Sequence, residues 1–161
     1  MYERVLIPVD GSDLAEAILP FAEKVAGPVD AEVLLLTVVE PLSPGEAMAA
    51  AGVMAPDTLL MREMEARAYV AKLAARLGDK GLRARALVRL GVPATEIAAA
   101  AADQGADLIA MTTRGRSGLG RIVFGSVAET VLRNASVPVL MFRMTEKAAM
   151  PAATATAEGR R

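Results

Sequence analysis

The sequence predicts an α/β fold: an open, doubly wound sheet of five parallel strands flanked by four helices. Two observations predict it. Short, almost continuous apolar runs are typical of strands buried on both faces. Between them lie stretches with apolar residues every three or four positions, the period of an amphipathic helix. Because strand–helix–strand units form right-handed crossovers, this alternation favours a parallel sheet covered on both faces.

The elements follow one another with clear turn residues between them. The first strand closes at Asp10-Gly11-Ser12, and the first helix stops at Gly27-Pro28. The predicted strands span 4–9, 32–39, 83–90, 107–112 and 137–142, and the predicted helices span 14–25, 57–77, 93–104 and 126–134. This order is that of a Rossmann-like sandwich.

Segment 41–56 is rich in Pro, Gly, Ala and Met without a consistent period, so we expect a long loop there. The methionines in and after it, Met48, Met54, Met61 and Met64, allow two interpretations. They form a surface for a partner, or they fill irregular gaps in the packing or cover a mobile loop. We favour packing.

Composition limits the function. The chain has 161 residues, 53% of them hydrophobic, enough for one core, and we expect one domain at 1–143 with a disordered tail at 144–161. The charge of the chain is nearly balanced, with 18 Lys and Arg against 19 Asp and Glu. A protein without a net positive charge is not expected to bind nucleic acid or an anionic membrane. Cys and His are both absent, so disulfides, thiolate chemistry and the commonest metal ligand are excluded. With neither an export signal nor a long apolar run, we expect a cytoplasmic protein.

Ligands of open parallel sheets bind beyond the carboxyl ends of the strands. The first loop at such a position is Pro8-Val9-Asp10-Gly11-Ser12. Asp10 can accept hydrogen bonds from a ribose or a base, or it can form a local Asx turn into the helix. The residues leave both interpretations open.

The second such loop, 112–126, is the most informative segment. Its glycines let a backbone approach a ligand, and Arg114, Arg116 and Arg121 supply positive charge. Ser126 and Glu129 match a capping box at the start of the last helix, whose free N–H groups would attract an anion. These features predict a phosphate-binding loop, with Arg116 as the favoured phosphate contact.

Three segments together resemble the universal stress protein family: Val5-Leu6-Ile7-Pro8-Val9-Asp10-Gly11-Ser12, then Gly115 followed by nine residues and Gly125-Ser126, then Val137-Pro138-Val139-Leu140. The resemblance covers residues 2–143. ATP-binding members carry a loop of the form G-x2-G-x9-G-[ST]. This chain has Thr112 in place of the first glycine, which predicts crowding of the ligand and weaker or altered ATP binding.

The resemblance implies an adenine-nucleotide site and a dimer formed through the last strand, Val139 to Phe142. An apolar edge strand that pairs with a second copy is protected from other pairing. The residues expected to surround the nucleotide are Pro8, Val9, Asp10, Val38, Met111, Thr112, Gly115, Arg116, Gly125, Ser126 and Val127.

Three functions are compatible with these features. The first is an ATP-binding stress-response or regulatory module that acts by binding rather than turnover, with Mg²⁺ as a possible companion of the phosphates. The second is a slow ATP hydrolase, for which only Asp10 and loop hydroxyls could orient water. The third is a dimeric adaptor, or a binder of AMP or cyclic AMP, that does not hold ATP.

Overall fold

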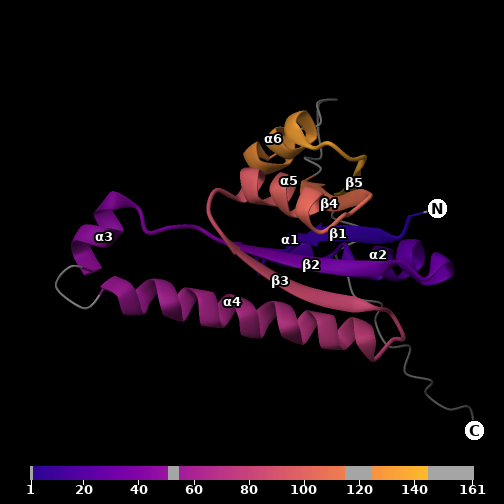
Figure 1. The fold of residues 1–161 in the computed structure, drawn as a ribbon, viewed down its shortest axis with the longest axis horizontal. Helices are drawn as coiled ribbons and strands as arrows, with labels where there is room; N and C mark the ends of the chain where they lie inside the picture. The colour runs from indigo at the N-terminus through magenta and orange to yellow at the C-terminus, as the bar shows by residue number, and fades with distance from the viewer. Residues whose placement is uncertain (1, 51–54, 115–124, 145–161) are drawn as a thin grey trace, which may run out of the picture.

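The computed structural model describes residues 2–50, 55–114 and 125–144 and contains one five-stranded parallel sheet (Figure 1). The strands lie in the order β3-β2-β1-β4-β5. Their bounds are β1 Arg4–Pro8, β2 Glu32–Val39, β3 Ala84–Leu90, β4 Leu108–Arg114 and β5 Val139–Met144. The predicted fold class is confirmed. The last strand runs to Met144, one residue past the expected domain end, and the rest of the expected tail, 145–161, lies outside the described residues.

Helices cover both faces of the sheet. Their bounds are α1 Asp13–Glu16, α2 Leu19–Ala26, α3 Pro44–Ala50, α4 Ala55–Gly78, α5 Pro93–Asp103 and α6 Ser126–Asn134, with a 3₁₀ turn at Gly27–Val29. Helices α2 and α4 pack on one face and α5 and α6 on the other (Figure 1).

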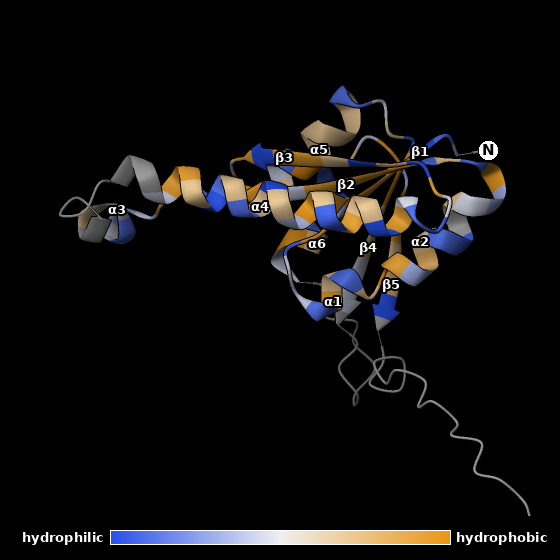
Figure 2. Ribbon diagram, turned by 90° about the horizontal axis from the view of Figure 1, so that it is seen from below, coloured by the Kyte–Doolittle hydropathy of each residue, from blue (hydrophilic) through white to orange (hydrophobic). Residues whose placement is uncertain are grey.

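Side chains alternate along each strand and so build two separate cores. In β1, Val5 and Ile7 face α2 and α4, whereas Leu6 between them faces α5 and α6. All three are at most 1% exposed. Figure 2 shows the strands as predominantly hydrophobic, whereas α4, which covers them, mixes both characters. Burial on both faces explains the continuous apolar runs of the sequence.

The predicted helix 14–25 is two helices, α1 and α2. Pro20 has no N–H to donate to the carbonyl of Glu16, and its ring would clash with that carbonyl in a continuous helix. Accordingly α1 ends at Glu16 and α2 begins at Leu19. Helix α1 contacts β4.

The loop predicted at 41–56 contains a helix, α3. A capping box begins it: the backbone N–H of Ser43 donates to Glu46 at 2.8 Å, and the N–H of Glu46 donates to the Ser43 hydroxyl at 3.3 Å. This S-x-x-E pattern was readable in the sequence. Residues 51–54 lie outside the described residues.

The methionines of this region do not fill gaps in the core. Met48, Met61 and Met64 are 84%, 60% and 61% exposed, so the prediction that these three fill gaps in the packing was wrong. Met54 is not among the described residues. No helix within the described residues is both long and apolar enough to cross a membrane.

Candidate functional site

A cavity of about 520 Å³ lies at the carboxyl ends of β1, β2 and β4. The strand order reverses at β1, which pairs with β2 on one side and β4 on the other, so the cavity lies at the switch point where open α/β sheets bind ligands. It is lined by Pro8, Val9, Asp10, Ser12, Leu14, Ala15, Leu36, Val38, Glu40, Pro93, Ile97, Met111, Thr112, Thr113, Gly125, Val127 and Ala128.

The loop after β1 presents Asp10 to this cavity. Oδ1 of Asp10 accepts hydrogen bonds from the backbone N–H and the hydroxyl of Ser12, at 3.0 and 2.6 Å. Ser12 in turn caps α1, because its Oγ accepts from the N–H of Ala15 at 3.1 Å. The Asx turn therefore exists, and its carboxylate also lines the cavity. Of the two oxygens, only Oδ1 accepts a hydrogen bond from the described residues.

Helix α4 holds the same loop through Tyr69. The Tyr69 hydroxyl accepts from the N–H of Gly11 at 3.1 Å and donates to Glu16 at 3.1 Å. Burial and the bonded carboxylate of Glu16 raise the pKa of Tyr69 to about 12, so the phenol stays protonated. Gly11 has a φ of 81°, a left-handed conformation that favours glycine at this position. One phenol thus couples the Asp10 turn to the long helix.

Two threonines at the end of β4 behave differently. The Thr112 hydroxyl donates to the backbone carbonyl of Leu14 in α1 at 2.9 Å. Thr113 is 5% exposed and lines the cavity, and its hydroxyl has no hydrogen-bond partner among the described residues. A buried hydroxyl without a partner is costly, so a ligand that bonds to it would gain affinity.

Helix α6 begins one residue earlier than the predicted capping box requires. Gly125 is the N-cap, with φ −65° and ψ 155°, and its carbonyl accepts from the N–H of Glu129 at 2.9 Å. Glu129 therefore stands four residues after the cap, not three, and the Ser126 capping-box prediction was wrong. No side chain caps this end within the described residues, so the first-turn N–H groups and the positive helix end are directed toward the region of Gly125.

Comparison with known proteins assigns the chain to a family. The model of the Universal stress protein family matches residues 1–143. The chain belongs to the universal stress protein family. The chain is 38% identical over 149 residues to Universal stress protein MJ0531 of Methanocaldococcus jannaschii, an alignment that covers 91% of this chain and 85% of the relative.

Solved structures agree with this family assignment. The structure of MJ0577, a universal stress protein of the same archaeon, has a TM-score of 0.74 and 28% identity, with 91% of this chain and 99% of that chain covered. A family member from Arabidopsis thaliana, solved with AMP bound, has a TM-score of 0.60, covering 90% of this chain and 94% of that chain. At 17% identity the second likeness shows the fold alone.

The fold brings most of the predicted site residues of this universal stress protein to one cavity. These are Pro8, Val9, Asp10, Val38, Met111, Thr112, Gly125 and Val127. Ser126 is exposed and is not part of the cavity lining. Gly115 and Arg116 lie outside the described residues.

Sequence reasoning missed several residues of the lining. Glu40 directly follows β2, and a polar residue at a strand end is a signal that could have found it. Pro93 and Ile97 belong to α5, which the pairing of strands far apart in the sequence brings above the cavity. Thr113 also lines the cavity, whereas the resemblance implied only its neighbour Thr112 as a nucleotide contact. Within the described residues no group of three or more carboxylates forms a metal site.

Proposed function

We propose that the cavity at the switch point binds an adenine nucleotide, ATP in the first instance, and that the chain is a cytoplasmic regulatory module of the stress response that acts by binding rather than turnover. The observation that carries the proposal is the cavity itself. Its volume of about 520 Å³ falls in the range of small-molecule sites, and its position is the ligand edge of the sheet.

The apolar part of the lining suits a purine. Val38 lies in β2 and Met111 in β4, Val9 directly follows β1 between them, and Ile97 comes from α5. A purine ring buries apolar faces and keeps polar edges, the combination that such pockets favour. We place the base between these side chains.

The charges orient the rest of the nucleotide. Glu40 follows β2, whereas Gly125 starts α6 beyond β4, and β1 with Asp10 lies between them in the sheet. The carboxylate of Glu40 repels phosphate, and the helix end at Gly125 attracts it. The base therefore lies toward β2, the ribose near Asp10 and Thr113, and the phosphates toward α6 and the predicted contacts Gly115, Arg116 and Ser126. Mg²⁺ would enter with the phosphates.

Two further points belong to the proposal. The chain forms a homodimer through β5, an edge strand that pairs only with β4 among the described strands. AMP and cyclic AMP are the alternative ligands: the fold relative from Arabidopsis thaliana was solved with AMP, and another universal stress protein, at 21% identity and a TM-score of 0.55, was solved with cyclic AMP.

The test is calorimetric titration of the nucleotide-stripped full chain with ATP and Mg²⁺. Gly125→Val is the informative variant. Its φ of −65° suits any residue and a Cβ there meets no atom of the described residues within 4 Å, so we expect the fold to accept the change, whereas the new side chain would block a phosphate that approaches the helix end. Gly45→Val is the matched control, because Gly45 is exposed in α3, a Cβ there also meets no atom of the described residues within 4 Å, and it is not part of the cavity lining.

We expect saturable binding in the wild type and the control, and a loss of at least about tenfold in Gly125→Val, as for removal of one or two charged hydrogen bonds. Absence of wild-type ATP binding would remove the ATP proposal. Competition with ADP, AMP and cyclic AMP would then decide whether a smaller nucleotide occupies the cavity or none does.

A further inference from the structure

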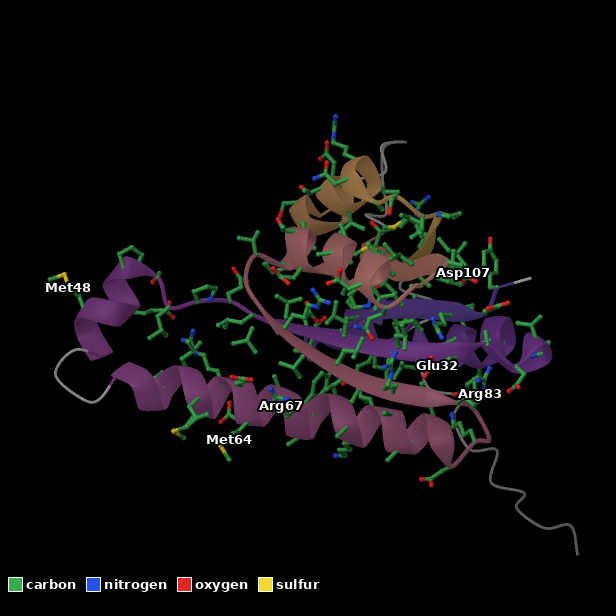
Figure 3. All side chains as sticks on the ribbon, viewed as in Figure 1. Glu32, Met48, Met64, Arg67, Arg83 and Asp107 are labelled. Carbon is green, nitrogen blue, oxygen red and sulfur yellow. The ribbon has the colours of Figure 1, made fainter. Side chains whose placement is uncertain are left out.

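The outer side of α4 carries an exposed apolar row along most of its length. Its residues, which we call the α4 seam, are Met61, Met64, Ala68, Ala71, Ala75 and Gly78. Met64 points away from the sheet in Figure 3. The opposite side of the helix packs in the core through Val70, Leu73 and Leu77. This helix is therefore apolar on two sides, unlike a surface helix that has only the sheet to cover.

The spacing of the α4 seam is that of a coiled coil. Its residues follow one another at intervals of three, four, three, four and three, a heptad repeat with apolar residues at a and d. Alanine at three of the six positions leaves room for a second helix at the short end of the usual 8–10 Å axis separation. The seam thus fits a helix, rather than a flat surface.

We propose that the α4 seam binds the same seam of a second copy of this chain, with the two helices antiparallel. In the register that aligns a with d positions about a two-fold axis, each large side chain faces a small one. Met61 lies opposite Gly78 of the second copy, and Met64 lies opposite Ala75. At the centre Ala68 lies opposite Ala71, so the seam is complementary to itself in size.

Charge complementarity supports the same register. Glu65 and Lys72 are exposed and flank the α4 seam at two e positions. In antiparallel coiled coils e positions face e positions, so Glu65 of each copy faces Lys72 of the other. The two-fold axis makes this pair twice.

Other arrangements place like charges together. Sliding one helix by a heptad in one direction sets Glu65 against Glu65 and Arg67 against Arg67, and sliding it the other way sets Lys72 against Lys72. A parallel pair sets Arg67 beside Lys72 of the other copy, twice. Such like-charge contacts select one register of a coiled coil.

This contact is separate from the proposed nucleotide site and from strand pairing. The seam lies on the outer side of a helix that covers one face, whereas β5 is at one edge of the sheet. A chain that uses both surfaces forms assemblies larger than a dimer. The proposal therefore stands or falls independently of the nucleotide.

Cysteine cross-linking tests the register directly, because the chain has no cysteine of its own. Met64→Cys and Ala75→Cys are made separately, then mixed and oxidised. Facing positions come within disulfide reach, whereas two copies of Met64, offset by eleven residues in this register, are about 16 Å apart along the axis. We expect cross-linked dimers in the mixture and little in either variant alone. Equal, weak cross-linking in all three samples would overturn the proposal, and efficient cross-linking of Met64→Cys alone would overturn the antiparallel register.

Charge reversal gives a second measurement on chains without cysteine. Glu65→Lys sets Lys against Lys in both pairs, and we expect sedimentation equilibrium to show association through this surface weakened about tenfold or more at low salt. The double variant Glu65→Lys with Lys72→Glu exchanges the charges and should restore it. Arg133→Glu on α6, which covers the other face, is the matched control and should leave the mass unchanged. A double variant no stronger than Glu65→Lys, or a single variant equal to the wild type, contradicts the proposed pairing.

Discussion

The hydroxyl of Thr112 donates a 2.9 Å hydrogen bond to the backbone carbonyl of Leu14, and this bond joins the end of β4 to α1. The resemblance to ATP-binding members predicted a glycine at this position, so the side chain was expected to crowd the ligand. Thr112 does line the cavity, but its hydroxyl is used by α1. The threonine side chain thus occupies part of the cavity wall and in return bonds β4 to α1.

Replacing Thr112 should separate these two effects. Thr112→Gly removes both the bond and the Cβ, and we expect it to lower the free energy of unfolding by about 1–2 kcal/mol while strengthening ATP binding. Thr112→Ser keeps the hydroxyl and serves as the control. Chemical denaturation and calorimetry measure the two quantities, and unchanged ATP affinity in Thr112→Gly would show that the side chain does not crowd the nucleotide.

Thr113→Val should lower the affinity for the nucleotide without lowering the free energy of unfolding. Its buried hydroxyl has no partner among the described residues, so an apolar group of the same shape should leave the free energy of unfolding unchanged or raise it by up to about 1 kcal/mol. If a ribose or phosphate oxygen bonds to this hydroxyl, nucleotide affinity falls several-fold. Binding and unfolding are measured on the same preparation, and a clear loss of stability would mean that the hydroxyl has a partner within the protein.

The contribution of Tyr69 to stability should decrease at alkaline pH. Its folded pKa of about 12 exceeds the ordinary value of 10.0, so its contribution to stability is complete below pH 10 and is lost as the pH rises toward 12. The difference in unfolding free energy between wild type and Tyr69→Phe should therefore shrink over this interval. Other groups titrate in both proteins and cancel. A difference that stays constant up to pH 12 would contradict the role of the phenol.

The contribution of Glu46 to the stability of α3 should decrease at acidic pH. A hydrogen bond from Arg62 and two contacts with Ser43 lower its pKa from 4.5 to about 2. Its contribution to α3 is therefore present above pH 4.5 and is lost as the pH falls toward 2. The protection of the α3 amides, taken relative to the intrinsic exchange rate at each pH, should therefore fall in that interval in the wild type. Glu46→Gln, which cannot ionise, should show faster exchange already at neutral pH and no further change of this kind.

The sequence by itself determined the class of fold and one wall of the site. Strands buried on both faces must be apolar along their whole length, and helices on a sheet must be apolar on one side, so these periods are visible without a structure. The loop after β1 was also visible, because turn residues follow the strand end that presents Asp10. The helix break at Pro20 and the capping box at Ser43 are local signals. Both are present in the sequence, but the spacing of apolar residues alone does not show them.

Only the tertiary structure decided which distant residues meet. Strand order placed β4 beside β1, and so brought Thr113 into the lining, while the crossover after β3 brought Pro93 and Ile97. Neither the bond from Thr112 to Leu14 nor that from Tyr69 to Glu16 has a local signal, because 98 and 53 residues separate the partners. The α4 seam needed the structure for another reason: its heptad spacing is in the sequence, but the exposure of its residues depends on how the helix packs.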